Sequence, residues 1–358
     1  MFPFWAMSFV LVTGGAGYIG SHVVAALLRE GKRVIVIDSF LNSDESVIDA
    51  LLNLAIGDDQ LISYKVDLMD FEATLEVFSN HQIECVVHCA GLKAVGESWR
   101  DPLLYYEVNL LTTINLLKCM QLCSVNSLVY SSSATVYGNP QSGQLIDENY
   151  TQLNPTSPYG RTKLMNERII MDCVKAGTLK TACILRYFNP VGADPSGLIG
   201  EAPRGIPNNL MPNICLAAYK QLTDGNNFQS TIKLKVYGGD YETLDGTAVR
   251  DYIHVADLAI GHLRAIEYTN TNAPGCHVFN LGTGSGYTVL QVINAFQRAS
   301  GVELDYEIVE RRQGDVPVLV ADATKARKLL GFTPVRGLNE MCRDQWSWFM
   351  NHAKTDNV

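Results

Sequence analysis

The first half of the chain alternates short runs of β-branched and aliphatic residues with longer stretches of helical period, and this alternation constrains the fold more than any other feature. The predicted strands are residues 9–13, 33–38, 62–67, 84–89, 127–131 and 181–186, and the predicted helices are 18–30, 70–80, 103–123 and 159–176. Continuous apolar runs such as VIVI at 34–37 are typical of strands buried on both faces of a parallel sheet. The repeated strand–helix units predict an α/β fold with a doubly wound parallel sheet.

The regular alternation ends after residue 189. Residues 190–213 are rich in proline and glycine, which is typical of a loop that shapes a ligand site. A length of 358 residues allows two to three domains at ~150 residues each. We expect a first domain over residues 1–189 and a smaller α+β lobe, mainly for the substrate, over 190–358. Part of 250–290 is expected to return to the first domain.

Charge and cysteine usage exclude several classes of protein. The chain has 28 Lys and Arg against 37 Asp and Glu, a net charge of −9, without any longer basic run than the pair at 311–312. Such a field repels phosphate backbones and anionic lipid, so we expect no nucleic acid and no membrane as partner. The nine cysteines lack the spacing of a disulfide scaffold, and no apolar stretch approaches the ~20 residues of a membrane span. These features predict a cytoplasmic protein with reduced thiols, and no ligand spacing predicts a metal site.

A glycine-rich turn follows the first predicted strand directly. Residues 13–20 read TGGAGYIG; Gly14, Gly17 and Gly20 fit G-x-x-G-x-x-G, and Gly15 with the last two fits G-x-G-x-x-G. Without Cβ atoms the turn can be tight, and its backbone can approach a pyrophosphate at the N-terminus of the next helix. A purely structural turn is the alternative. No Lys-Ser/Thr pair follows, which excludes a P-loop.

Asp38 ends the second predicted strand, 18 residues after Gly20. An acid at this point can accept hydrogen bonds from the adenosine ribose, and it repels a 2′-phosphate. Alone, Asp38 would be interpreted as a turn or cap residue. Together with the glycine turn, it predicts NAD rather than NADP as cofactor.

Tyr159 and Lys163 lie four residues apart in the last of these predicted helices, so they share one face. A phenol titrates near 10, so a phenolate base at pH 7 needs its pKa lowered by about 3 units. The ammonium and a positively charged nicotinamide ring both act in that direction. Alone, such a pair is most often a surface contact. The serines at 131–133, however, end a strand at the sheet edge where α/β proteins bind ligands.

Nine stretches of the chain together resemble the extended short-chain dehydrogenase/reductase family, and within it the UDP-galactose 4-epimerases. They are TGGAGYIGSH, HCAGLKAVGES, SSSATVYG, SPYGRTK, LRYFNPVGA, GIPNNLMP, GTAVRDYIHVADLA, NLGTG and RRQGD. The resemblance implies a Rossmann fold, tightly held NAD, UDP-galactose and UDP-glucose as substrates, and a homodimer. The implied reaction oxidises the sugar at C4, turns the 4-keto sugar and reduces it from the other face.

The resemblance also implies roles for individual residues. Tyr159 is the base, Lys163 lowers its pKa and holds the nicotinamide ribose, and Ser133 donates to O4 of the sugar. The implied cofactor residues are Gly14, Gly17, Tyr18, Ile19, Gly20, Asp38, Ser39, Asp67, Leu68, Ala90, Lys93, Asn109, Tyr159 and Lys163. The implied substrate residues are Ser133, Asn189, Asn209, Leu210, Arg250, Tyr252, Arg312, Asp315 and Leu319. The two arginines suit a diphosphate, because guanidinium groups bind it through charge-assisted hydrogen bonds.

Two positions bear on the family pattern. Ser39 stands where family members often carry Asn. Leu319 takes the position whose size governs N-acetylated sugars, which an aromatic residue excludes and Cys or Ser admits. Leucine is intermediate in size, which leaves activity on UDP-GlcNAc and UDP-GalNAc open, and we favour turnover of the non-acetylated pair only.

Three other activities are weaker interpretations. A nucleotide-sugar 4,6-dehydratase carries Asp-Glu after the strand-end Thr, whereas this chain has Ser133-Ala134-Thr135 without a carboxylate. A UDP-glucuronate epimerase or decarboxylase needs a cation for the C6 carboxylate, and the sequence shows none clearly. A non-catalytic NAD-binding sensor is expected to lose Tyr159 or Lys163, and both are present.

Overall fold

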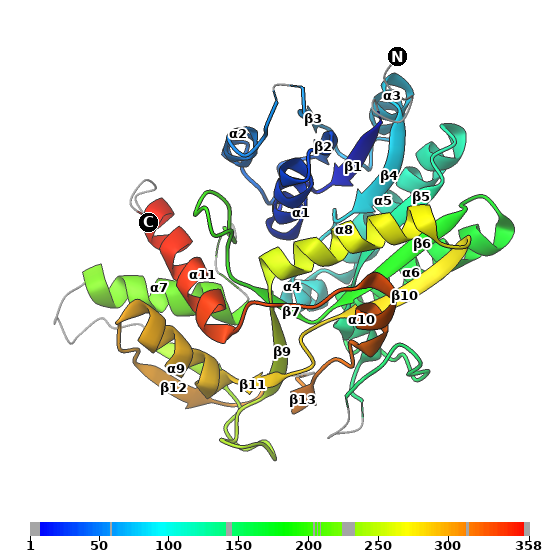
Figure 1. Cartoon of the computed structure of the whole chain (residues 1–358). Helices are drawn as coiled ribbons and strands as arrows, with labels where there is room; N and C mark the ends of the chain where they lie inside the picture. The colour runs from blue at the N-terminus through cyan, green and yellow to red at the C-terminus, as the bar shows by residue number, and fades with distance from the viewer. Residues whose placement is uncertain are drawn as a thin grey trace.

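A seven-stranded parallel sheet forms the centre of the molecule in the computed structural model (Figure 1). The structure describes residues 8–353 except 58, 141–144, 203, 204, 206, 208, 224–232, 313 and 314. Across the sheet the strands are β10 (Gly275–Leu281), β6 (Thr181–Tyr187), β5 (Ser127–Ser133), β4 (Ile83–His88), β1 (Phe9–Thr13), β2 (Val34–Asp38) and β3 (Leu61–Lys65). All six pairings between neighbours are parallel. The predicted α/β doubly wound sheet is therefore confirmed.

Helices cover both faces of this sheet. One face carries α1 (Tyr18–Arg29), α2 (Ser46–Leu52), α8 (Val255–Thr271) and α10 (Thr324–Leu330). The other face carries α3 (Phe71–Asn80), α5 (Pro102–Leu122) and α6 (Pro158–Ala176). Most of these helices follow the predicted periods. Four helices, α2, α4 (Val95–Arg100), α8 and α10, were not predicted; α2, α4 and α10 have only one or two turns, which are too short to show a period.

Side-chain caps set where several helices begin. Asp70 accepts a hydrogen bond from the Ala73 N–H at the start of α3. Ser157 does the same for the Gly160 N–H at the start of α6, where Pro158 occupies the first turn. Such caps satisfy N–H groups that have no partner within the helix. The α6 cap also fixes the helix turn that carries Tyr159.

A second group of elements packs beside the carboxyl edge of the sheet. A small sheet orders β11 (Gly286–Thr288), β9 (Val249–His254) and β13 (Val318–Leu319), and β7 (Asn189–Val191) also pairs with β9. The strands β8 (Leu234–Tyr237) and β12 (Tyr306–Val309) form a separate parallel pair. A core of its own joins β7, β8, β9 and β11 to α7 (Leu210–Thr223), α9 (Val289–Ser300) and α11 (Leu338–Ala353).

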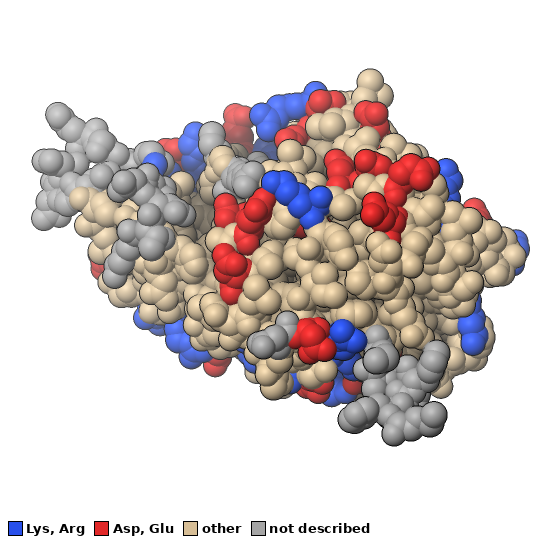
Figure 2. Space-filling model, turned by 90° about the horizontal axis from the view of Figure 1, so that it is seen from above, with Lys and Arg blue, Asp and Glu red and all other residues tan. Residues whose placement is uncertain are grey.

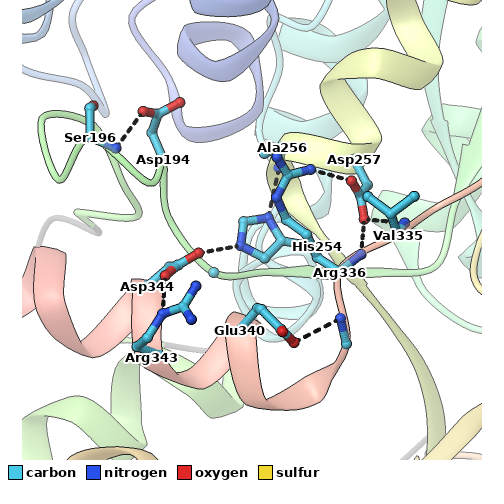
Figure 3. A network of polar contacts seen from close by, with 12 residues as sticks. Asp194, Ser196, His254, Ala256, Asp257, Val335, Arg336, Glu340, Arg343 and Asp344 are labelled. Carbon is cyan, nitrogen blue, oxygen red and sulfur yellow. Dashed lines mark hydrogen bonds and ion pairs between the residues drawn. The ribbon is translucent and has the colours of Figure 1, made fainter.

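Buried polar contacts connect α11 with β9 and α8 (Figure 3). His254, at the end of β9, accepts at Nδ1 from the Ala256 N–H and therefore donates from Nε2 to Asp344, 3.2 Å away. Arg343 holds the other oxygen of the same carboxylate at 2.8 Å. Asp257 of α8 accepts from Arg336 just before α11. These contacts keep α11 against the end of the small sheet.

Among the described residues, neither the surface charges nor the thiols indicate a particular binding partner. On the face seen in Figure 2, acidic and basic side chains are interspersed among a larger area of other residues. Among the described helices, none combines the length and the apolar character needed to cross a membrane. The nine cysteines all lie in the described ranges and are free thiols. Within the same ranges, His, Cys and carboxylate side chains form no group able to hold a metal ion.

Candidate active site

The carboxyl ends of neighbouring strands place the predicted cofactor residues along one edge of the sheet. Asp67 and Leu68 follow β3, and Asp38 ends β2. The glycine turn follows β1, Ala90 and Lys93 follow β4, and Ser133 ends β5. Parallel strands present these ends on the same side, which is where α/β sheets bind ligands. Residues at or after the ends of five strands thus lie along one edge of the sheet, in the order β3, β2, β1, β4, β5.

The glycine turn is too crowded for side chains. A Cβ on Gly20 would lie 2.0 Å from the Gly14 carbonyl oxygen, and one on Gly14 would lie 2.8 Å from the Ala90 backbone. Gly14 also has a φ of +65°, a conformation that glycine adopts readily. Gly17 is the N-cap residue of α1 and has no side chain to cap the helix. The free N–H groups of that helix end are therefore available to an anion such as a pyrophosphate.

Asp38 is fixed between the glycine turn and the loop after β2. Its Oδ2 accepts from the Ala16 N–H at 3.0 Å. Its Oδ1 accepts from the Phe40 N–H and the Ser43 hydroxyl, both at 2.9 Å. A carboxylate held in this way has lone pairs left for ribose hydroxyls. Ser39 beside it is exposed and adds no buried contact.

Asn109 supports the cofactor edge from α5. It is buried, accepts from the Leu92 N–H at 2.8 Å and donates to the Leu92 carbonyl at 3.1 Å. It also donates to Thr162 on α6 at 3.0 Å. Asn109 therefore holds the loop after β4, which carries Lys93, against the helix that carries Tyr159. The Asn109 side chain is therefore used to position the backbone at Leu92 and does not point into solvent.

Ser133, Tyr159 and Lys163 meet where β5 ends and α6 begins. Ser133 Oγ accepts from the Thr135 N–H at 3.2 Å and from the Thr135 hydroxyl at 3.0 Å, so its own proton is free to be donated. Hydrogen bonding to Ser133 acts to lower the pKa of Tyr159. Lys163 Nζ lies 5.9 Å from the Tyr159 ring centroid and donates to the Ser131 carbonyl at 2.7 Å. The structure thus brings together the three residues that the sequence singled out for catalysis.

Burial shifts the pKa values of both titratable groups of this site, Tyr159 and Lys163. Burial raises the pKa of Tyr159 to about 12, and the bond with Ser133 opposes this rise only partly. Burial also lowers the pKa of Lys163 to about 8. The expectation that Lys163 and a bound nicotinamide ring together lower the phenol pKa stays a prediction, since burial acts in the opposite direction and Lys163 Nζ donates to Ser131. A phenolate at neutral pH would need further positive charge beside the ring.

A buried ion pair that the sequence did not reveal lies behind this group. Glu167, one helical turn after Lys163, accepts from Arg186 of β6 at 3.0 Å (Nε) and 2.7 Å (Nη2). It also accepts from Ser132 at 2.5 Å. This network joins α6, β5 and β6 and so fixes the distance between Ser133 and Tyr159. Glu167 falls on the i+4 repeat of Tyr159 and Lys163, which is the signal that could have found it.

Four of the nine predicted substrate residues, Asn189, Arg250, Tyr252 and Leu319, lie on the small sheet. Asn189 pairs with Tyr252 between β7 and β9, and Arg250 pairs with Leu319 between β9 and β13. Arg250 Nη2 lies 3.5 Å from an Asp315 oxygen. Its Nη1 donates to the carbonyls of Val249 at 2.9 Å and Val316 at 2.7 Å.

The other predicted substrate residues stand on separate segments. Leu210 begins α7, and Asn209 before it donates to Glu201 at 2.9 Å. The Arg312 guanidinium lies over the Tyr237 ring, 3.9 Å from its centroid. Leu319 is buried in a cluster that includes Phe188 and Ala134, the residue directly after Ser133 in the chain.

Two further buried polar residues shape this side and were not predicted. Asp251 accepts from the Thr283 N–H and hydroxyl, the Gly284 N–H and the Ala321 N–H. Asn280 donates to the Ile146 carbonyl at 2.7 Å and accepts from Tyr137 at 2.6 Å. Asp251 stands inside the motif GTAVRDYIHVADLA, where a charge within a strand could have signalled a buried carboxylate.

The comparisons with known proteins agree with this geometry. A family model described as "NAD dependent epimerase/dehydratase family" matches residues 10–282. The chain belongs to this NAD-dependent epimerase/dehydratase family. Among curated relatives, a UDP-glucose 4-epimerase of Bacillus subtilis is 47% identical over 339 residues, covering 95% of this chain and 96% of that protein. One of Mus musculus is 46% identical over 346 residues, covering 96% of each.

Solved structures of the same kind align over nearly the whole chain. A UDP-glucose 4-epimerase from Bifidobacterium longum in complex with NAD⁺ and UDP has a TM-score of 0.90 at 42% identity, covering 98% of this chain and all of that one. The enzyme from Stenotrophomonas maltophila, with bound NAD and formylated UDP-arabinopyranose, gives the same values. The expected family resemblance is confirmed.

Proposed function

We propose that this chain interconverts UDP-galactose and UDP-glucose with NAD as cofactor. The observation that carries the proposal is the meeting of Ser133, Tyr159 and Lys163 beside a glycine turn that only small residues can form. The similarity to UDP-glucose 4-epimerases over 95% of the chain supports this substrate class.

The residues present fit NAD. Cβ atoms at Gly14 and Gly20 would collide with backbone atoms of the turn. Because glycine has no Cβ, the backbone N–H groups of the turn are left accessible to the pyrophosphate. Asp38 is held beside that turn, where it would accept from a ribose hydroxyl, and Lys93 and Tyr159 follow β4 and β5 further along the same edge. Bound NAD would supply a hydride acceptor and donor for C4 of the sugar.

The chain's own residues handle the proton and the sugar. Tyr159 removes the proton of the 4-hydroxyl as the C4–H bond breaks, which leaves a 4-keto sugar, and it returns the same proton after the sugar has turned. Ser133 keeps its proton and donates a hydrogen bond to O4, because its oxygen already accepts two hydrogen bonds from Thr135. Lys163 provides positive charge near the phenol. Hydride and proton are each removed and returned, so the net reaction is an isomerisation.

Arg250 and Arg312 are proposed to bind the diphosphate, with Asn189, Asn209, Leu210, Tyr252 and Asp315 around the nucleotide sugar. Asp67, Leu68, Ile19, Tyr18, Ser39, Ala90 and Asn109 are proposed to complete the cofactor site. Leu319 is proposed to leave too little space for an N-acetyl group. We further propose a homodimer in the cytoplasm, and a division into 1–189 for NAD and 190–358 mainly for the UDP-sugar.

An interconversion assay tests the function. Purified protein is incubated with UDP-galactose without added nucleotide, and the products are separated by chromatography. UDP-glucose is the expected product, because tightly held NAD is regenerated in each cycle. The same assay with UDP-GlcNAc tests Leu319, and turnover at a similar rate would contradict the size argument. Absence of UDP-glucose from protein shown to contain NAD would overturn the proposed substrate.

A further inference from the structure

Glu201 connects two residues that belong to opposite sides of the proposed site. Its Oε1 accepts from Lys93 Nζ at 3.0 Å and from Asn209 Nδ2 at 2.9 Å. Lys93 follows β4 on the cofactor side, whereas Asn209 directly precedes α7 on the substrate side. The Glu201 side chain is only 4% exposed. One carboxylate oxygen of a buried side chain therefore accepts hydrogen bonds from two donors, one on the cofactor side and one on the substrate side.

The surroundings tie this carboxylate to the glycine turn as well. Lys93 Nζ lies 5.5 Å from the centroid of the Tyr18 ring, at the start of α1. The Tyr18 hydroxyl donates to the Gly192 carbonyl at 2.6 Å, in the loop that leads to Glu201. The Glu201 charge also contributes to raising the pKa of Tyr18, although burial is the larger cause. Glu201 is thus linked through Lys93 to Tyr18, the first residue of the helix that follows the glycine turn.

We propose that Glu201 is a positioning residue that couples UDP binding at Asn209 to the hydrogen bond between Lys93 and Glu201, because Lys93 and Asn209 share the Oε1 atom of Glu201. This inference rests on the function proposed above, since it takes UDP as the substrate's nucleotide. Each donor weakens the oxygen as acceptor for the other. When UDP engages Asn209, Lys93 becomes the principal donor to Glu201 and is drawn toward it. Conversely, when Lys93 leaves, the buried carboxylate holds Asn209 more tightly and UDP binds less well.

The test measures UDP affinity by isothermal titration calorimetry on NAD-saturated protein. Four proteins are compared: the natural chain, Lys93→Met, Glu201→Gln and the double variant. Lys93→Met is expected to weaken UDP binding about fivefold in the natural background and by less than about twofold beside Glu201→Gln. A purely structural role of Glu201 would change the affinity but leave the effect of Lys93→Met equal in both backgrounds.

A second background protects the test against poor folding of Glu201→Gln. In Asn209→Ala the shared donor is removed while Glu201 stays, so Lys93→Met should again lose its effect on UDP. Arg264→Met is the matched control, because it also removes a cation 2.8 Å from a glutamate, Glu267, but on the exposed face of α8. Its UDP affinity should equal that of the natural chain.

The outcomes separate the coupling from the function itself. The coupling is overturned if UDP binds but Lys93→Met does not change the UDP affinity of the natural chain, or changes it equally in all backgrounds. Failure of the natural chain to bind UDP at all overturns the proposed function, and the coupling falls with it.

Discussion

Predicted residues on the cofactor side follow parallel strands within a few positions, whereas those on the substrate side are held by contacts between segments far apart in the chain. Asp38 and Ser133 are themselves the last residues of β2 and β5. By contrast, Asp251 of β9 holds the backbone at Thr283, Gly284 and Ala321. The cofactor side therefore depends on backbone geometry and on the lack of side chains. The substrate side depends on satisfying buried polar groups.

The two sides consequently differ in how a substitution does damage. On the cofactor side, an added methyl group displaces backbone, and removal of a reacting group leaves the fold intact. On the substrate side, removal of one acceptor leaves several buried N–H groups without a partner, which costs folding free energy. The predictions below test this difference.

Tyr159→Phe should give the largest change in turnover. The variant removes the base but only one hydrogen bond, with Ser133, so turnover should fall about 10²- to 10⁴-fold while unfolding free energy and bound NAD change little. Product chromatography and the absorbance of bound NAD measure the two effects. Turnover within about tenfold of the natural chain would mean that another group takes the proton.

Gly20→Ala tests the dependence on backbone. The new Cβ would lie 2.0 Å from the Gly14 carbonyl, so the turn must open and NAD affinity should fall about 10- to 100-fold. Gly96→Ala is the matched control, because it is also helical but has open space around its Cβ position. Alanine favours a helix over glycine by about 1 kcal/mol, so the control should be neutral or slightly more stable. Equal NAD affinity in both variants would contradict the crowded turn.

Asp251→Asn tests the substrate side. An amide replaces one of two oxygens that accept four hydrogen bonds, so the unfolding free energy should fall by about 3 kcal/mol. UDP affinity should fall with it, because Arg250 is the neighbouring residue, while NAD stays bound. Asp70→Asn serves as control, since Asn caps a helix about as well as Asp. Loss of NAD together with UDP would mean that the two sides are not separable.

The same contrast explains what the sequence could predict. Most of the central sheet and the approach of Ser133 to Tyr159 follow from local runs and from the geometry of parallel strands. The strand β10 was missed as such, because His277 and Asn280 interrupt its apolar pattern and its partner β6 lies far away in the chain. Glu201 and Glu167 were missed because their partners are set by tertiary packing. The opposing effect of burial on the Tyr159 pKa could not be predicted, because burial cannot be measured from spacing.

Lys163 lies on the cofactor side, but its buried ammonium affects folding stability, as the buried polar groups of the substrate side do. Its titration tests whether the two sides differ as completely as described above. Burial lowers its pKa to about 8 in the folded protein, against an ordinary value near 10.5 when unfolded. Between these values the unfolded chain binds more protons than the folded one, so folding stability gains with rising pH. The unfolding free energy of the natural chain should therefore increase relative to Lys163→Met by about 2 kcal/mol from pH 7 to pH 10.

Denaturant unfolding of both proteins without NAD, at pH 7, 8, 9 and 10, measures this difference. The titration of the buried thiols contributes equally to both proteins and therefore cancels in the difference. The gain should lie mostly above pH 8. A difference that stays flat over this range would mean that the ammonium keeps its ordinary pKa. Desolvation would then not govern this corner of the site, and the raised pKa of Tyr159, which has the same physical cause, would be in doubt with it.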